Sequence, residues 1–276
     1  TCTKPDRDVV IVGAHIGSLA IPISLHCRTL LAVEANPYTF GMLADNVMLN
    51  GRSNIIPLCA AADVETGRQL DFLCGTVNSG GSKRMPKTLR GDYIMDDPER
   101  VKVKTVKLDD VCGTLQPSLV HMDIEGSEVF AMRGATWLLA ATEYLSIEFI
   151  SHHLTDVAGV TVDEWLAPIE EAGFNKMMLP GDATLNRPTL AIEPEDWRPM
   201  LNTTNIVALI ADVIGLMQMY SNPGVRVHST LDNAIFFGAY LLLHVGVAAV
   251  LSVKAESKVA KWFYYISAAI HIFLLA

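Results

Sequence analysis

Short apolar runs alternate with longer amphipathic stretches over residues 1–210 of the chain. The apolar runs predict buried strands at Asp8–Val12, Leu30–Glu34, Asn54–Leu58, Leu119–Ile124 and Tyr144–Ile150. The stretches between them predict helices at Gly17–His26, Pro37–Asn50, Glu128–Ala140 and Val162–Ala172. Strands alternating with helices are typical of an α/β fold, in which helices cover both faces of a mostly parallel sheet. Ligands of such sheets bind beyond the carboxyl ends of the strands.

The stretch Gly75–Asp97 interrupts this alternation. It reads GTVNSGGSKRMPKTLRGDYIMDD, which is rich in glycine, serine and basic residues and has no clear period. A loop of this length is typically either functional or disordered. We therefore expect either a lid or partner contact on the acceptor side of a ligand site, or a solvated loop. The basic residues that favour the first alternative are Lys83, Arg84, Lys87 and Arg90.

The C-terminal part of the chain has a different pattern. Residues 233–253 carry no charged side chain and would form a helix of about 31 Å, the thickness of a bilayer's hydrocarbon core. A second apolar run begins at Trp262 beside Lys261, as at a membrane interface. We predict a transmembrane helical hairpin, with a buried pair of core helices as the alternative. The apolar run 206–220 contains Asp212, which favours a last strand and a surface helix over a third span.

These patterns divide the chain into four parts. We expect an N-terminal tail at 1–7, an α/β domain at 8–210, a connecting segment at 211–232 and transmembrane helices at 233–276. The predicted location is a membrane, organelle membranes included. Small and polar residues in the predicted spans, such as Gly238, Gly246 and Ser252, favour packing against other membrane-protein subunits.

Charge and cysteine content narrow the function. Residues 1–210 contain 17 Lys and Arg against 27 Asp and Glu, a net charge of −10. An acidic domain argues against nucleic acid as a partner, because phosphates bind to basic surfaces. The five cysteines are dispersed and have no spacing typical of zinc, so we expect reduced thiols and no metal site.

The first strand runs into a glycine turn that is a candidate ligand site. In VIVGAHIG, Gly13 and Gly17 allow close approach of a ligand to the backbone, and the following helix directs its N-terminus to the same place. Alone, this spacing is equally typical of a tight turn without a ligand. The second strand ends in Glu34, where an acid commonly binds ribose hydroxyls. Together the two features favour a nucleoside-like ligand over a simple turn.

Five motifs in order carry a more specific resemblance: VGAHIG, VEANPYTFGMLADNVMLNG, AAADVETG, TVKLDDV and HMDIEGSEVFAMRGA. In this order they resemble the FkbM-type methyltransferases over about residues 8–210. The resemblance implies a Rossmann-like fold, S-adenosylmethionine as the cofactor and O-methylation of a hydroxyl. It places the acceptor chemistry at Asp123 and His121. It places cofactor contacts at Gly13, Ala14, His15, Gly17, Glu34, Asn36, Asp63 and Asp123.

The chain departs from the family pattern at three positions of this site. Ile11 stands where the family usually has Asp, His15 where it has Asn, and His121 where it has Lys. The loss of one charged contact at Ile11 would weaken cofactor binding by about 1.5–3 kcal/mol. Two hypotheses follow: a membrane-anchored methyltransferase, or a catalytically impaired accessory subunit of a membrane complex in which cofactor binding is weakened or lost. Nicotinamide chemistry fits less well, because the chain contains no G-x-G-x-x-G motif.

Overall fold

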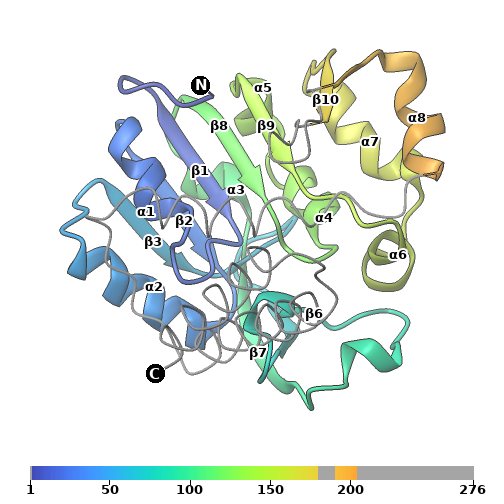
Figure 1. The fold of residues 1–276 in the computed structure, drawn as a ribbon, viewed down its shortest axis with the longest axis horizontal. Helices are drawn as coiled ribbons and strands as arrows, with labels where there is room; N and C mark the ends of the chain where they lie inside the picture. The colour runs from blue at the N-terminus through green and yellow to red at the C-terminus, as the bar shows by residue number, and fades with distance from the viewer. Residues whose placement is uncertain (1, 180–189, 204–276) are drawn as a thin grey trace, which may run out of the picture. The chain divides into compact units, whose positions relative to one another are not determined.

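A five-stranded parallel sheet forms the centre of the protein. The computed structural model describes residues 2–179 and 190–203, and its strands lie in the order β3-β2-β1-β8-β9 (Figure 1). The five strands are β1 (Asp8–Val12), β2 (Leu30–Glu34), β3 (Ile55–Cys59), β8 (Pro117–Met122) and β9 (Tyr144–Ile147). The predicted α/β class and the five predicted strands are confirmed, and only the ends of β3, β8 and β9 differ from the prediction.

Helices cover both faces of this sheet, which is why β1, β2 and β8 are buried at every position. The helices are α1 (Ala20–Ile23), α2 (Pro37–Leu49), α3 (Leu108–Val111), α4 (Glu128–Arg133), α5 (Thr136–Ala140), α6 (Ser151–His153), α7 (Val162–Glu171) and α8 (Pro194–Thr203). Alternation along β1 places Ile11 in the apolar cluster with α1 and α2. Val12 lies in the other cluster, with α4, α5 and α7 (Figure 1).

The predicted helix over 128–140 is divided into α4 and α5 at Gly134. A Cβ at this position would lie 2.1 Å from the backbone oxygen of Asp63. Gly134 therefore allows the chain to pass close to the strand region around Asp63, and the prediction of one continuous helix is wrong at this point.

A second, smaller sheet lies beyond the carboxyl ends of β1 and β8 (Figure 1). Its strand order is β4-β7-β5-β6, with β4 at Ala61–Ala62, β7 at Glu99–Val106, β5 at Gln69–Cys74 and β6 at Lys83–Arg84. We did not predict this sheet, although β7 (ERVKVKTV) carries a clear signal. Val103 and Thr105 are buried while Lys102 and Lys104 are exposed, which is the period-2 alternation of a half-buried strand.

Residues 75–97, here called the insertion, are ordered into short elements. They comprise a 3₁₀ turn at Ser79–Gly81, strand β6 and a second 3₁₀ turn at Gly91–Tyr93. The described part also contains a small antiparallel pair, β10 (Met177–Leu179) and β11 (Leu190–Ile192).

The predicted membrane segments lie at 233–276 and fall outside the described residues, as do 206–220. Within the part of the chain that the structure describes, no helix has both the length and the apolar character needed to cross a bilayer.

Candidate functional site

The turn after β1 is built on two glycines with positive φ. Gly13 has φ +86°, and a Cβ there would lie 1.9 Å from the backbone oxygen of Asp123. The strand order reverses between β1 and β8, so this close approach lies at the topological switch point where ligands of such sheets bind. Gly17 has φ +91° and packs against Leu43. Both glycines are therefore needed for the fold of the turn, whether or not a ligand binds there.

Glu34, at the end of β2, fastens the turn to the sheet. Its Oε2 accepts a hydrogen bond of 2.7 Å from the backbone N–H of His15, and its Oε1 accepts one of 2.8 Å from that of Asn36. The Thr39 hydroxyl also donates to Oε1, at 3.0 Å. Burial raises the pKa of Glu34, and these donors oppose the rise. A carboxylate oxygen can accept two hydrogen bonds, so Oε2 retains acceptor capacity that fits a ribose hydroxyl.

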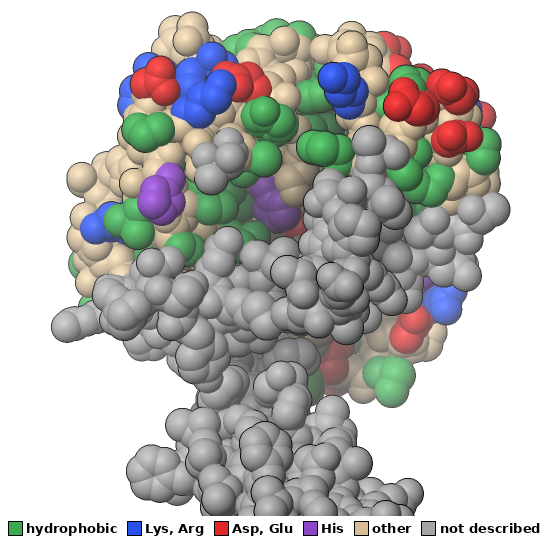
Figure 2. Space-filling view, turned by 45° about the horizontal axis from the view of Figure 1, so that its top comes forward, with side chains coloured by type: hydrophobic (Ala, Val, Ile, Leu, Met, Phe, Trp, Pro, Cys, Tyr) green, Lys and Arg blue, Asp and Glu red, His purple; other side chains and the backbone are tan. Residues whose placement is uncertain are grey.

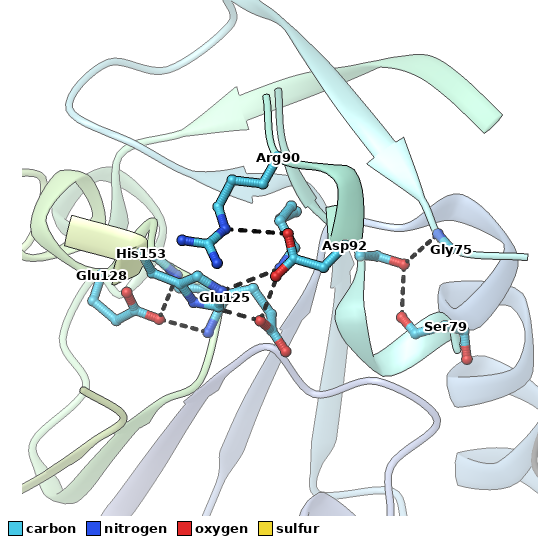
Figure 3. A network of polar contacts seen from close by, with 11 residues as sticks. Gly75, Ser79, Arg90, Asp92, Glu125, Glu128 and His153 are labelled. Atoms are coloured by element: carbon cyan, nitrogen blue, oxygen red, sulfur yellow. Dashed lines mark hydrogen bonds and ion pairs between the residues drawn. The ribbon is translucent and has the colours of Figure 1, made fainter. Parts of the chain in front are cut away.

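The insertion contacts this turn through Ser79 and the start of α2 through Ser82. His15 has φ +50°, a region in which Asn and His are enriched, and its Nε2 lies 2.9 Å from Ser79 Oγ. Asn36 donates from Nδ2 to Ser82 Oγ at 3.1 Å. Gly75 donates its backbone N–H to the same oxygen, close to Ser79 (Figure 3). The side chains of His15 and Asn36, which we predicted to contact a cofactor, thus also hold the insertion against the turn.

Asp63, predicted to lie beside adenine, forms a buried ion pair. Its Oδ2 lies 2.7 Å from a guanidinium nitrogen of Arg84 on β6, and its Oδ1 accepts from the N–H of Val64. The Arg84 guanidinium lies 3.7 Å from the centre of the Phe130 ring, and burial lowers its pKa. The geometry assigns Asp63 a structural partner, and a contact with adenine stays a prediction.

Four carboxyl groups gather beyond β8 and β9. Asp123, Glu125 and Glu128 follow β8, and Glu148 follows β9. Glu125 has φ +54°, an unfavourable region for this residue type, so the turn holds its side chain in place at the cost of backbone strain. Glu128 accepts hydrogen bonds from the N–H groups of Ile124 (2.9 Å) and Gly126 (3.3 Å).

The mutual proximity of these groups changes their protonation. Burial, together with the charge of Asp123, raises the pKa of Glu128 to about 7. Burial and then the charges of Asp123, Glu125 and Glu128 raise the pKa of Glu148 far above its usual range, and Glu148 hydrogen bonds to Asp123. Glu148 is therefore protonated at neutral pH and donates a hydrogen bond to Asp123.

Lys83 and His153 complete the cluster from the insertion and from α6 (Figure 3). Lys83 Nζ lies 3.1 Å from Glu125 Oε2, 3.3 Å from His153 Nε2 and 4.6 Å from the centre of the Tyr93 ring. Burial and the charge of Lys83 lower the pKa of His153 to about 3, so its imidazole is neutral.

His121, the predicted partner of Asp123 in acceptor chemistry, lies within β8. Its Nδ1 lies 3.1 Å from Ser146 Oγ on β9, and it is directly beside Ile11 of β1 in the strand register. Burial lowers its pKa to about 4. A neutral imidazole with so low a pKa is a weak base at neutral pH.

The structure thus brings most of the predicted residues to one edge of the sheet. Gly13, Ala14, His15, Gly17, Glu34, Asn36 and Asp123 lie at the carboxyl ends of β1, β2 and β8. Sequence reasoning named Lys83 and Arg84 only as basic residues of the 75–97 stretch, and it missed Glu148 and His153. Glu148 had a signal, because it is a lone acid in the apolar run YLSIEFI, whereas nothing local distinguishes His153.

The surface in view carries no continuous basic patch among the described residues. Lys and Arg side chains lie interspersed with Asp and Glu (Figure 2). All five cysteines are free thiols.

The parallel sheet, the glycine turn and the acid that ends β2 define a Rossmann-like α/β domain. The family model of the methyltransferase FkbM domain matches residues 12–176, and the chain belongs to this family. The predicted resemblance is confirmed for the domain.

Individual relatives are more distant. Over 48 residues the chain is 44% identical to a tRNA(Phe) (4-demethylwyosine(37)-C(7)) aminocarboxypropyltransferase of Pyrococcus horikoshii, a match that spans 17% of each protein. A methyltransferase FkbM from Methylobacillus flagellatus is 20% identical with a TM-score of 0.40, covering 59% of this chain and 38% of that one. YcgJ from Bacillus subtilis is 10% identical with a TM-score of 0.38, covering 79% and 78%. These likenesses assign no activity.

Proposed function

We propose that this chain is an S-adenosylmethionine-dependent methyltransferase that methylates a hydroxyl of its acceptor. Membership of the FkbM domain family supports the methyltransferase class. The main support for this cofactor is Glu34, which lies at the end of β2 beside the glycine turn and retains hydrogen-bond acceptor capacity on Oε2. When bound, S-adenosylmethionine supplies a methyl group on a positively charged sulfur.

The chain's own residues would bind this cofactor at two places. Glu34 would accept a hydrogen bond from a ribose hydroxyl, and the turn from Gly13 to Gly17 would pass beside the methionine part. The carboxyl groups beyond β8 would favour a positive charge nearby, because their proximity to one another, together with burial, already raises the pKa of Glu148.

Asp123 is the group best placed to act on the acceptor. Its backbone meets Gly13, so its side chain belongs to the same edge as the proposed cofactor site. In methyl transfer the acceptor oxygen forms a bond to the methyl carbon while the bond from that carbon to sulfur breaks, and the hydroxyl proton must leave. We assign its acceptance to the Asp123 carboxylate. His121 would act only by position, since its pKa of about 4 makes it a weak base.

Calorimetric titration of the full chain with S-adenosylmethionine and with its demethylated product tests this proposal. We expect saturable binding that Glu34→Gln weakens by about tenfold or more, because the amide replaces an acceptor that is paired with backbone donors. Glu65→Gln is the matched control, since the Glu65 side chain is 66% exposed. Absence of heat with a folded chain, or equal binding by both variants, would overturn the cofactor assignment.

The second candidate function is a catalytically impaired accessory subunit. The observation that favours it is Ile11, which is fully buried among apolar residues where the family usually has an acid. A folded chain that binds neither cofactor form but purifies with partner membrane proteins would support this function. Cofactor binding with methylation of any hydroxyl acceptor would exclude it.

We also propose that residues 233–276 anchor the protein in a membrane. The support is the uncharged length of 233–253 and the aromatic start of the second apolar run. Extraction of membranes with alkaline carbonate tests this anchor: retention of the chain in the pellet is expected, and its release would contradict the proposal.

A further inference from the structure

Three potential metal ligands converge beyond β8 and β9. Among the residues that the structure describes, Glu125, Glu148 and His153 each offer one ligand atom, and these atoms lie within 4.8 Å of one another. His153 Nδ1 lies 3.6 Å from Glu125 Oε2. This separation is close to that of two ligands bonded to one cation at about 2.1 Å each.

Two of the three groups present a buried atom that has no hydrogen-bond partner within the described part of the chain. These atoms are Nδ1 of His153 and Oε2 of Glu148. His153 is only 4% exposed, and an unsatisfied polar atom at such a site costs about 1–3 kcal/mol. The unsatisfied imidazole nitrogen is directed at the Glu125 carboxylate, so the cost would be removed by a cation held between them.

The charges around this point also favour a cation. Asp123 and Glu128 add to the carboxyl groups of Glu125 and Glu148, and burial together with this repulsion raises the pKa of Glu148. Two basic side chains face the cluster. Lys83 forms an ion pair with Glu125, and the charge of Arg90 lowers the pKa of His153. Asp92 opposes Arg90 there, and His152 and Tyr93 are further titratable neighbours that pack on His153.

We propose that Glu125, Glu148 and His153 form a binding site for a divalent first-row metal cation such as Mn²⁺ or Zn²⁺. Two carboxylates and one imidazole suit these ions better than Mg²⁺ or Ca²⁺, which prefer ligand sets made of oxygen alone. Binding requires Glu148 to release its proton and His153 to present Nδ1 unprotonated. Glu125 is partly exposed, with 21% of its side chain accessible, and gives the cation access from solvent.

Lys83 is the competitor for this site. Its ammonium lies 3.1 Å from the Glu125 ligand oxygen and 3.3 Å from His153 Nε2. When Nδ1 binds a metal, Nε2 carries the proton and can no longer accept from Lys83. The metal and the Lys83–His153 contact therefore exclude each other, so removal of the lysine charge strengthens metal binding.

Titration of the chelator-treated full chain with Mn²⁺, followed by electron paramagnetic resonance, tests the site without any measurement of activity. We expect loss of the free Mn²⁺ signal with one ion bound per chain, and a nitrogen coupling from an imidazole ligand in the pulsed spectrum. Glu148→Gln and His153→Gln should each weaken binding by about tenfold or more. His152→Gln, at the adjacent residue of α6, is the matched control and should leave the affinity within about twofold.

Lys83→Met keeps the proposal testable if either ligand variant fails to fold. It should tighten Mn²⁺ binding by about tenfold, because it removes a positive charge beside a ligand oxygen. Absence of saturable binding of both Mn²⁺ and Zn²⁺ at about 1 mM would overturn the site. So would binding that lacks the nitrogen coupling, or binding that Glu148→Gln and His153→Gln leave unchanged in folded protein. Because the readout contains no cofactor, its result is independent of the methyl-transfer function.

Discussion

Ile11 and His121 depart from the family pattern at neighbouring positions. The register of β1 and β8 places Ile11 directly beside His121. The Asp and Lys that the resemblance implies at these positions would form a cross-strand pair of opposite charge. In this chain the pair is an apolar side chain beside a neutral imidazole. Together the two departures leave no lone charge at this pair of positions.

The first prediction concerns this pair. Ile11→Asp and His121→Lys should each destabilise the fold by about 2–4 kcal/mol, because each buries a charge without a partner. The double variant should be more stable than the sum of the two losses by at least about 1 kcal/mol. Denaturant unfolding of the four proteins measures this coupling. Additive losses would show that the two side chains do not interact.

The second prediction concerns Glu128, whose pKa of about 7 in the folded protein lies above its ordinary value of 4.5. Between these two values the folded state binds the proton more tightly than the unfolded state, so folding stability falls as pH rises from 4.5 to 7. Glu128→Gln keeps an oxygen that accepts from Ile124 and Gly126 but removes the titration. We expect the variant to gain up to about 3 kcal/mol over the parent between pH 4.5 and 8.

Unfolding by urea at several pH values measures this gain. Glu65→Gln, at an exposed position, should run parallel to the parent protein throughout. A Glu128→Gln curve parallel to that of the parent would mean that Glu128 titrates normally in the folded state.

Among the secondary-structure elements, β6 has only two residues, yet both form ion pairs that hold the insertion against the central sheet. Adjacent strand residues point to opposite faces, so Lys83 reaches Glu125 while Arg84 reaches Asp63. Both basic side chains are buried. The basicity that suggested a surface contact from the sequence is thus used largely within the molecule, to fix the insertion at the carboxyl edge.

The third prediction tests this anchoring. Asp63→Ala should cost about 3–5 kcal/mol, because it leaves the Arg84 guanidinium buried without its partner. The double variant Asp63→Leu/Arg84→Met should cost much less, since no charge remains unpaired. Arg100→Met removes an exposed ion pair with Asp71 and should have no measurable effect. Equal losses from Asp63→Ala and the double variant would contradict the role of charge.

How far the elements could be predicted depended on the range of the interactions that form them. Strands such as β1 and β2 follow from local apolar runs, so their bounds were predicted correctly. The divided helix at Gly134 depends on a contact with Asp63, which is distant in sequence. Strand β6 is only two residues long and is held by pairing with β5 and by its ion pairs, so no local pattern marks it.

The same limit applies to the candidate site. Glu34 and the glycine turn were predictable because they lie within one β-α-β unit. The contact of Lys83 with His153 joins residues 70 positions apart, and it exists only because the insertion folds back over the carboxyl edge. Such pairs need the tertiary structure before their chemistry can be recognised.

At the scale of the whole molecule, two sets of buried groups have opposite effects on the pH dependence of stability. His121 and His153 have pKa values of about 4 and about 3, below the ordinary 6.5. The stability that they contribute to the folded state is therefore complete above pH 6.5 and is lost as pH falls. Glu128 and Glu148 have raised pKa values, so their contribution to folding stability increases as pH falls towards 4.5. The two effects oppose each other between pH 4.5 and 6.5.

The fourth prediction follows from this opposition. Stability of the parent protein should change little from pH 6.5 to 5, whereas His121→Gln should become more stable on acidification, by about 2 kcal/mol relative to the parent. Unfolding by urea at pH 6.5 and pH 5 measures the difference. His26→Gln, at an exposed histidine, serves as the control. A His121→Gln variant that follows the parent would show that His121 protonates as readily in the folded state as in the unfolded one.

The backbone N–H groups of His15 and Asn36 lie in connecting segments, yet both donate to the buried carboxylate of Glu34. Hydrogen–deuterium exchange of these amides requires an opening that breaks their hydrogen bonds to Glu34. The side chains of the same two residues also bind Ser79 and Ser82. Any opening that exposes the two amides must therefore move the turn relative to the insertion, so these connecting-segment amides should exchange as slowly as those of the central strands.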